Sequence, residues 1–503
     1  MTAPANKLCA VRERGQVLVW FLAFAATLAV VFAGVYSVGQ VTSEKQKVVN
    51  ATDAAAYSGA LTEARALNLA SYTNRAVIAN EVLIAQMVSL DSWSSYFAKA
   101  TENYQKEANA LSAIPYIGIV FKAFAITLKA INVIAKVQAQ AMDAATPIAI
   151  GAWELLYAGW YNLTIAPAFV PPVMAFAAHA AAENVLAQNV ALQGDRTDSA
   201  PRLMQVLALG ARNEQEWERM IYRYSKSGRP GSRSDERKYA AELLLASRDE
   251  FSTDRPGSDT FFIKSLFGNS DLCINYIIKL GSEKQGPTRL VNYDRWEAQD
   301  TVEFKLDVPP SGVLGCEWGK GTVAVPQGWG RATADKNGSR GTRLNTSGGA
   351  GAMAYKENHG NRGYSGVKEL YDVKRDPKSG KPRYEEATYA VAASKQDTAI
   401  RTNESLGFMN RPVAGPLGSP EMKAGFAKDE VAAISEARIF FERPVRSNLD
   451  ITGGSLFRAD GNKEYASLYN PYWQVRLSTP SALTRASVYA LGGINPGLSV
   501  FAQ

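Results

Sequence analysis

This sequence contains few of the histidine and cysteine side chains that most often bind transition metals or serve as nucleophile and base. The 503 residues include only two histidines, His179 and His359, and three cysteines. No H-E-x-x-H or C-x-x-C spacing brings such residues together. A metal centre would therefore need ligands that are all carboxylates. We predict no metal site and no cofactor.

Two short motifs come near known binding sites without matching them. Asp91–Ser95 reads D-S-W-S-S, close to the D-x-S-x-S of metal-binding adhesion domains, but its serines are at the wrong positions. Gly348–Gly351 is rich in glycine, but no predicted strand precedes it, so it fits neither a dinucleotide nor a phosphate loop. There is also no G-x-S-x-G nucleophile motif.

No nucleophile, base and orienting partner occur at a recognisable spacing, so we predict that the chain is not an enzyme. The alternative is a membrane-anchored periplasmic hydrolase whose pocket would group carboxylates such as Glu303, Glu317 or Glu385. Charge adds little to the choice of function. The net charge is +7, and the first 200 residues balance 13 basic against 13 acidic side chains. The excess is spread over residues 201–503, too thinly to predict nucleic-acid binding.

An apolar segment near the N-terminus predicts a membrane anchor. Val17–Val38 contains no charged residue over 22 positions, enough for a helix to span the bilayer. Lys7, Arg12 and Arg14 precede it against Glu13 alone, which favours a cytoplasmic N-terminus with the rest of the chain outside. The alternative is a cleaved signal peptide, whose apolar core is usually about 7–15 residues long.

This topology separates the cysteines. Cys9 lies on the reducing side, whereas Cys273 and Cys316 both lie on the oxidising side. We predict a Cys273–Cys316 disulfide, which would stabilise the fold by about 3–4 kcal/mol in the loop-entropy model. Two independent buried cysteines are the alternative.

The region that follows the anchor is predicted to be helical. No proline occurs between Val17 and Ile114, so the membrane helix can continue as one long helix. Apolar residues at steps of three and four predict the buried face of this helix. The residues on that face are Leu69, Tyr72, Ala76, Ala79, Leu83, Met87, Leu90, Trp93 and Phe97.

A second helical run is expected from Pro115 to about Ala145. Lys122, Lys129 and Lys136 recur on it every seven residues. They form either a narrow solvent face or a face that lies against anionic lipid. Further helices are expected at about 173–192, 201–225 and 234–251.

The second half of the chain alternates apolar and polar residues over short stretches, which predicts strands. We expect these at 273–280, 301–308, 322–326, 384–394 and 437–445, with a final helix or extended segment over 460–490. Glycine is frequent over about 310–381, so that stretch is predicted to be mostly loop, with Asp335–Gly366 as a mobile loop.

Several motifs together resemble a known family. The sequence around them resembles the TadE/TadG-like proteins of bacterial Tad (Flp-type) pilus assembly over residues 12–95. The motifs are Arg14-Gly15-Gln16, Asn50–Ala60 (NATDAAAYSGA), Asn68-Leu69-Ala70, Asn74-Arg75-Ala76, Asn80-Glu81-Val82 and, near the C-terminus, Tyr469–Trp473. The resemblance implies a component of a pilus or secretion machine that is anchored in the inner membrane.

The same stretch supplies the candidate assembly residues. Small side chains at Ala54, Ala55, Ala56 and Gly59 allow another helix to approach closely. Asp53, Asn74, Arg75 and Asn80 are predicted to make polar contacts that set the register of packing. The alternative for each is an ordinary helix surface.

One position departs from processed pilins, which carry Glu five residues into the mature chain. Counting from Gln16, the fifth residue here is Trp20. We therefore predict a permanent anchor without prepilin-type cleavage. The adhesion-type metal site of the family has no counterpart here, so that role is not carried over.

Taken together, the sequence predicts an α+β protein. Residues 1–16 are cytoplasmic, 17–39 form the transmembrane helix, 40–255 form a helical stalk or bundle, and 256–503 form a mixed, β-rich head. We expect a non-catalytic structural or assembly component of a Tad (Flp-type, type IVc) pilus or a related secretion machine. Its partners would be the lipid bilayer and other pilus-assembly or pilin subunits. A surface adhesin or minor tip pilin is the alternative, and the sequence does not specify the oligomeric state.

Overall fold

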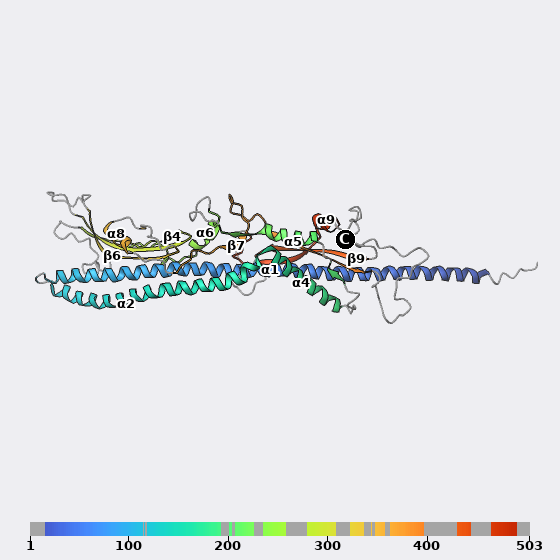
Figure 1. Cartoon of the computed structure of the whole chain (residues 1–503), viewed down its shortest axis with the longest axis horizontal. Coiled ribbons are helices and arrows are strands. Elements are labelled where there is room, and N and C mark those ends of the chain that lie inside the picture. The colour runs from blue at the N-terminus through green and yellow to red at the C-terminus, as the bar shows by residue number, and fades with distance from the viewer. Residues whose placement is uncertain are drawn as a thin grey trace, which may run out of the picture.

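A computed structural model of the full chain shows a long rod (Figure 1). It describes residues 16–113, 115, 118–192, 201–203, 207–225, 235–257, 279–307, 322–336, 344, 348–357, 363–396, 430–443 and 464–489. Cys9, Cys273 and Cys316 lie outside these residues, so the disulfide stays a prediction.

One helix runs through the whole rod. Helix α1 extends from Gln16 to Leu111 without interruption, 96 residues or about 144 Å. Its first part, Val17–Tyr36, is apolar, long enough to cross a membrane and not buried by other elements. The predicted continuation of the apolar segment into one long helix is therefore confirmed.

Further helices lie against α1. Helix α2 (Gly118–Leu156) folds back antiparallel to it, and the Asn132 side-chain amide donates to the Ala98 carbonyl oxygen at 2.8 Å. A π-helical stretch, η1 (Tyr157–Ile165), follows, and then α3 (Ala166–Ala168) and α4 (Pro171–Leu192). Gly118–Ala168 also satisfies the length and composition of a membrane span, but one third of an 18-residue apolar window within it is buried in the protein.

The strands form antiparallel sheets that lie along the opposite side of α1 (Figure 1). Nearer the apolar start of α1, one sheet has the order β1 (Arg202–Leu203), β8 (Glu386–Gln396), β9 (Glu430–Phe441) and β10 (Trp473–Ser478). Farther along, β5 (Arg295–Asp307) pairs with β3 (Lys279–Gln285) and β4 (Thr288–Asn292) on one edge and β6 (Thr322–Asp335) on the other. Between these sheets, β2 (Ile221–Tyr224) pairs with β7 (Leu370–Val373).

Short helices cover the outer side of the sheets. They are α5 (Leu207–Met220), α6 (Lys238–Ala246), α8 (Gly348–Lys356) and α9 (Ala482–Tyr489). Strand β8 shows why both faces of its sheet are apolar. Tyr389 and Val391 join the cluster that includes α1, whereas Ala390 and Ala392 pack with residues of α5 and α9. The predicted α+β fold, with a long helix followed by a strand-rich region, is confirmed.

Some predicted boundaries are wrong. The helix expected over 201–225 ends at Met220, because the Ile-Tyr-Arg-Tyr sequence that follows pairs with β7 as strand β2. Part of the stretch predicted as loop over 310–381 forms regular structure, because its described residues include β6, α8 and β7. Two of its glycines serve close packing instead. A Cβ on Gly328 would lie 2.7 Å from Cβ of Ala100, and a Cβ on Gly330 would overlap the backbone of α1 at Ser92.

The buried face of α1 is not the one predicted. Leu69, Tyr72 and Leu83 are exposed by 45%, 61% and 46%, and only the later members of the predicted stripe become half-buried, against α2. The face under the sheets instead carries small and polar residues such as Asn74, Glu81 and Ser92. Small side chains let the sheets approach α1 closely, and the polar ones bond to groups on the sheets, so this face is buried despite its composition.

Candidate assembly site along the long helix

Two of the motifs that suggested the family resemblance meet in the fold. The backbone N–H of Trp473 donates to the Asn68 side-chain oxygen at 3.0 Å, and the Asn68 amide donates to the Trp473 carbonyl at 3.0 Å. Asn74 donates to the carbonyl oxygens of Leu468 and Tyr371, both at 2.8 Å. Helix α1 thus holds the 468–473 segment by hydrogen bonds to its backbone.

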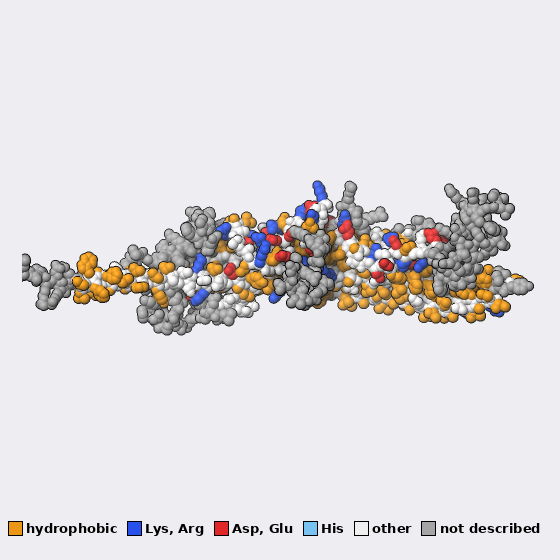
Figure 2. Space-filling view, turned by 180° about the vertical axis from the view of Figure 1, so that it is seen from behind, with side chains coloured by type: hydrophobic (Ala, Val, Ile, Leu, Met, Phe, Trp, Pro, Cys, Tyr) orange, Lys and Arg blue, Asp and Glu red, His pale blue; other side chains and the backbone are white. Residues whose placement is uncertain are grey.

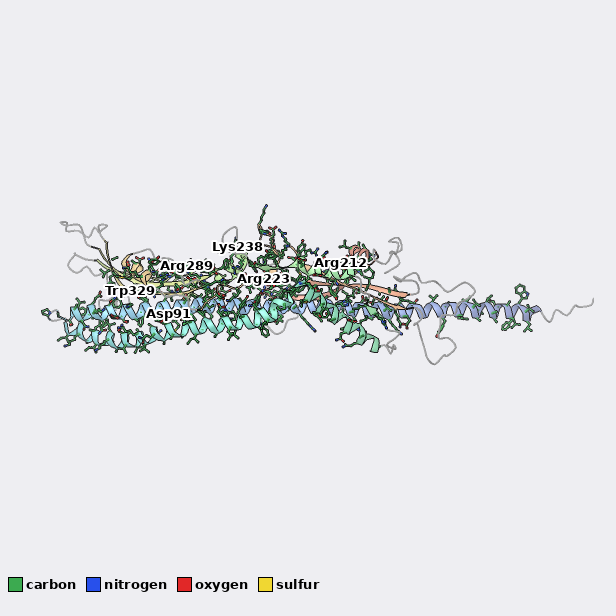
Figure 3. The ribbon with its side chains drawn as sticks, viewed as in Figure 1. Asp91, Arg212, Arg223, Lys238, Arg289 and Trp329 are labelled. Carbon is green, nitrogen blue, oxygen red and sulfur yellow. The ribbon has the colours of Figure 1, made fainter. Side chains whose placement is uncertain are left out.

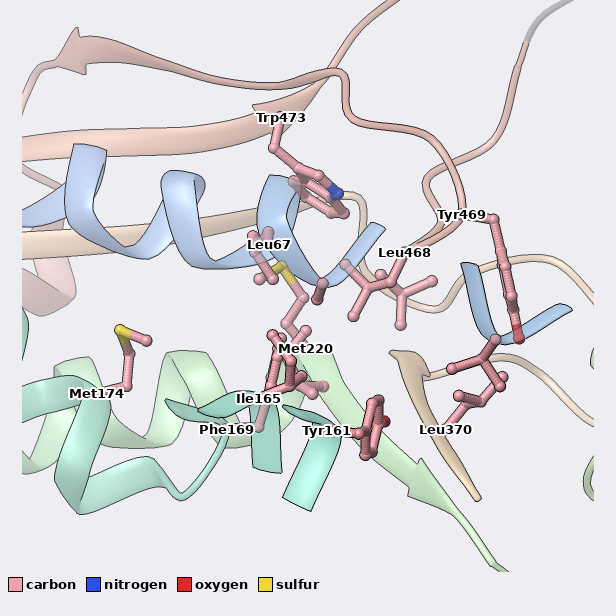
Figure 4. Close-up of a cluster of buried hydrophobic side chains, with 14 of the residues drawn as sticks. Leu67, Tyr161, Ile165, Phe169, Met174, Met220, Leu370, Leu468, Tyr469 and Trp473 are labelled. Atoms are coloured by element: carbon pink, nitrogen blue, oxygen red, sulfur yellow. The ribbon is translucent and has the colours of Figure 1, made fainter. Parts of the chain in front are cut away.

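Arg75 completes this set of contacts. Its Nε donates to the Tyr469 carbonyl oxygen and its guanidinium donates to the Asn470 side chain. Figure 4 shows Leu468, Tyr469 and Trp473 of this segment around α1, with Trp473 beside Leu67. Asn74 and Arg75 thus make polar contacts between two parts of the same chain, and a role in contacts with other subunits stays a prediction. Asn68 was missing from the predicted site residues, although it stands in the same repeated Asn pattern.

The small residues also pack within the chain. Ala55 and Ala56 are fully buried in the main apolar cluster, which also contains Ala178 and Ala182 of α4. Position 59 must be glycine because of a neighbouring strand: a Cβ there would overlap the ring of Tyr389 on β8. The close neighbour of this glycine is thus a strand and not a second helix. The predicted close approach thus involves both a helix and a sheet.

The remaining predicted residues lie apart from these contacts. Ala54 and Asp53 are half-buried, and Asp53 makes no hydrogen bond or ion pair with the described part of the chain. Asn80 is half-exposed and its amide donates back to the Ala76 carbonyl of the same helix at 2.7 Å. These three side chains are partly accessible to another molecule, and Arg75 is exposed although its guanidinium is held by the contacts described above.

Buried carboxyl groups were not predicted. Glu81, on the sheet-facing side of α1, is fully buried and accepts hydrogen bonds from Tyr364 Oη at 2.8 Å and Trp296 Nε1 at 3.3 Å. Burial raises the pKa of Glu81 to about 7, although these hydrogen bonds and the charge of Lys368 lower it. Burial likewise raises the pKa of Glu63 well above its usual value.

Near the anchor, a buried ion pair joins α1 to the first sheet. The Glu44 carboxylate lies 2.7 Å from Lys395 Nζ of β8, and both side chains are at most 2% exposed. Lys47 approaches the other carboxylate oxygen at 2.8 Å. The position of Glu44 eight residues after Tyr36 gave no sign of this pairing, because its partner is distant in sequence.

The Asp91–Ser95 run lies in α1 and belongs to a buried polar cluster. Ser92 Oγ donates to Asp300 Oδ2 at 2.8 Å, and the guanidinium of Arg255 binds both oxygens of the same carboxylate at 3.0 and 2.8 Å. Figure 3 places Asp91 on α1 at the same end of the rod as Trp329 of β6. Within the described residues, no three His, Cys, Asp or Glu side chains are grouped to hold a metal ion.

A pocket of about 500 Å³, including its open mouth, lies beside the middle of α1. Its walls include Glu81, Tyr239, Tyr293, Arg237 and Arg375. The two guanidinium groups stack on tyrosine rings, Arg237 on Tyr293 at 4.2 Å and Arg375 on Tyr239 at 3.8 Å. In each pair, the guanidinium group and the tyrosine ring restrict one another's orientation.

The carboxylates proposed for a hydrolase do not line this pocket. Glu303 lies on β5 and accepts a hydrogen bond from the backbone N–H of Ala350 at 2.7 Å. Glu385 directly precedes β8 in the sheet nearer the anchor, and Glu317 lies outside the described residues.

Comparison with known proteins bears on the N-terminal part of this site. The chain matches no curated protein and no solved structure. One family model matches residues 15–65 of the chain. This matched segment includes Asp53, Ala54, Ala55, Ala56 and Gly59, whereas Asn74, Arg75 and Asn80 lie beyond it. Residues 15–65 match the model of the putative Flp pilus-assembly TadE/G-like family, so the chain carries a TadE/G-like domain, which supports a role in Flp/Tad pilus assembly.

Proposed function

We propose that the chain is a membrane-anchored, non-catalytic structural component of a Tad pilus-assembly machine. One observation carries the proposal: residues 16–65 of the TadE/G-like match form the first half of a single helix to which both large sheets attach. A helix that is both membrane span and core element suits a fixed scaffold, because the head cannot turn independently of the anchor.

The proposed topology places residues 1–16 in the cytoplasm, 17–39 in the inner membrane and the remainder in the periplasm. The basic residues before the span support this orientation. The helical part, 40–255, and the strand-rich part, 256–503, then act as one unit, since α1 contacts strands of both sheets.

We further propose a division of labour among the site residues. Asn74, Arg75, Gly59 and the buried alanines fix the internal packing of the rod. Asp53 and Asn80 contact other pilus-assembly or pilin subunits, because their side chains remain accessible on α1.

A deletion and complementation experiment in the bacterium that encodes the chain tests the proposal. Deletion should abolish surface pili, and the wild-type chain should restore them. Asp53→Ala should lower pilus number while the protein level stays constant. The matched control is Glu183→Ala on α4, a carboxylate exchange outside the TadE/G-like segment.

Topology is read separately by labelling single introduced cysteines with a membrane-impermeant maleimide. Position 5 should be protected in intact cells, and position 99 should be labelled once the outer membrane is permeabilised. Normal piliation of the deletion strain would overturn the function, and labelling of position 5 alone would overturn the orientation. Recovery of the chain in sheared filaments would favour a minor pilin instead.

A further inference from the structure

The outer face of α2 repeats every seven residues. This face, the α2 seam, carries an apolar residue at six successive positions that alternate at steps of four and three, and it ends before the polar Gln140. The residues of the seam are Ile119, Ala123, Ile126, Ala130, Val133 and Val137, and all are exposed. The larger ones are 58–83% exposed. This is the pattern of a coiled-coil helix whose partner is missing.

Other residues of α2 already fill its contact with α1. Phe121, Ala125, Leu128, Asn132 and Ala135 are buried there at the same spacing. The α2 seam is therefore a second seam that this contact leaves uncovered. Figure 2 shows the apolar surface as an orange band along one side of the rod. Beyond the seam, further apolar side chains are each at least 55% exposed, namely Ile148, Leu155, Leu156, Trp160 and Leu163. Apolar surface of this extent marks an interaction site.

The bilayer that holds the anchor cannot cover this face. Asn132 of α2 is level with Ala98 of α1, to which it is hydrogen-bonded. The apolar span ends at Tyr36, 62 residues earlier on the same helix. At 1.5 Å per residue, the seam lies about 93 Å from the membrane surface along α1. The bilayer that holds the anchor is therefore not the occupant, and the heptad spacing of the seam fits a protein helix.

We propose that two copies of this chain pair in parallel through the α2 seam. The proposal rests on the membrane anchor of the proposed function but not on the pilus role. Two anchored copies point the same way, and identical α1 helices bring the two seams to the same height. Equal-register parallel pairing therefore needs no sliding of one rod along the other.

The lysines of α2 fit this arrangement. Lys122, Lys129 and Lys136 each stand just before a seam alanine or valine, at the g position of the heptad, and Lys136 also pairs with Glu102 of α1 at 2.9 Å. In a parallel pair, g faces the partner's e position five residues on, so Lys122 would face Thr127 of the other copy. In an antiparallel pair, g faces g, and the lysines would repel one another. The charges therefore favour parallel copies.

Oxidative crosslinking of introduced cysteines in native membranes tests the pairing. Ile126→Cys and Ala130→Cys place a thiol in the seam, where equivalent positions of a parallel pair come within disulfide range. Lys99→Cys is the matched control, because it lies at the same height on α1 and is exposed. The three native cysteines are retained, and the unsubstituted chain provides the baseline.

We expect a band at twice the 54.5 kDa monomer mass for both seam variants and for neither control. Absence of this band would overturn the proposal, as would equal crosslinking at position 99. Crosslinking of the seam to a different protein only would show a heterologous partner and would also overturn it. Alkaline extraction of the same membranes shows separately whether the chain is anchored.

A charged residue introduced at position 127 tests whether the two copies pair in parallel. Thr127 is exposed and its hydroxyl bonds to the Ala123 carbonyl of its own helix, so its exchange removes no bond to another element described in the structure. In the Ile126→Cys background, Thr127→Glu should raise the dimer equilibrium constant about fivefold through two pairs with Lys122, and Thr127→Lys should lower it about fivefold. An equal effect of both variants would refute parallel pairing.

Discussion

The buried carboxyl of Glu81 makes stability depend on pH in a predictable direction. Its pKa is about 7 in the folded chain against 4.5 when unfolded, because burial disfavours the charged form. A carboxyl whose pKa is raised on folding stabilises the protein while it is protonated. That contribution is fully present below pH 4.5 and is lost as the pH rises through 7.

The size of the effect follows from the difference between the two pKa values. A difference of about 2.5, at about 1.36 kcal/mol for each unit, amounts to roughly 3 kcal/mol. Glu81→Gln removes the charge while retaining an oxygen that accepts from Tyr364 and Trp296. The free energy of unfolding of the variant, relative to that of wild type, should therefore rise by roughly 3 kcal/mol as the pH is raised from 4 to 8. Any cost of burying the Gln amide is the same at every pH and does not alter this difference.

Thermal unfolding of the full chain in detergent, at half-unit steps of pH, measures the difference. For a chain of this size, roughly 3 kcal/mol corresponds to a few degrees in Tm. Glu102→Gln is the control, because hydrogen bonds from Lys106 and Lys136 lower the pKa of Glu102 to about 2. Glu102 is charged in both states above pH 5, so its variant should show a constant offset from pH 5 to 8. A constant offset for Glu81→Gln as well would refute the reasoning.

Three more predictions concern the packing along α1 and the head. Gly59→Ala should destabilise the fold by about 1–3 kcal/mol by overlap with Tyr389, and exchange of Tyr389 for leucine should restore part of the lost Tm. Asn74→Ala should cost about 2 kcal/mol through two lost bonds to backbone carbonyls, detected as faster amide exchange in the 468–473 segment; unchanged exchange there would contradict it. The Cys273–Cys316 disulfide should appear as a peptide pair linked in non-reducing mass spectrometry, and free thiols at both positions would exclude it.

Helices and strands that depend mainly on consecutive residues could be predicted from the sequence. The absence of proline between Val17 and Ile114 and the uncharged Val17–Val38 segment sufficed for the long helix and its apolar start. Strand β5 was evident from its alternating residues, although it begins at Arg295, earlier than predicted. These features depend on the intrinsic conformational preference of consecutive residues.

What the helix packs against was not predictable in the same way. Asn74, Glu81 and Ser92 lie on one face of α1, which is not the face that the apolar spacing predicted to be buried. Their partners are distant in sequence, as the separation of 394 residues between Asn74 and Leu468 shows. Burial of polar groups depends on such partners, so an amphipathic pattern alone chose the wrong face.

The structural role of two glycines was not predictable for a related reason. Gly328 and Gly330 contributed to the loop prediction over 310–381, but in β6 they let the strand lie directly on α1. A glycine that frees a turn and one that permits close approach are identical in a single sequence. Only the neighbouring helix distinguishes them.

The lateral attachment of the sheets to α1 has a mechanical consequence. Lys395 binds at Glu44, Trp473 at Asn68 and Asp300 at Ser92, so attachment points are distributed along the helix. A pull on the anchor along the helix axis loads all of them in shear at once. Bonds that share a load resist more force than bonds that are peeled apart one after another. The rod is therefore built to transmit tension along its length, whereas a sideways pull at one end would detach the sheets in sequence.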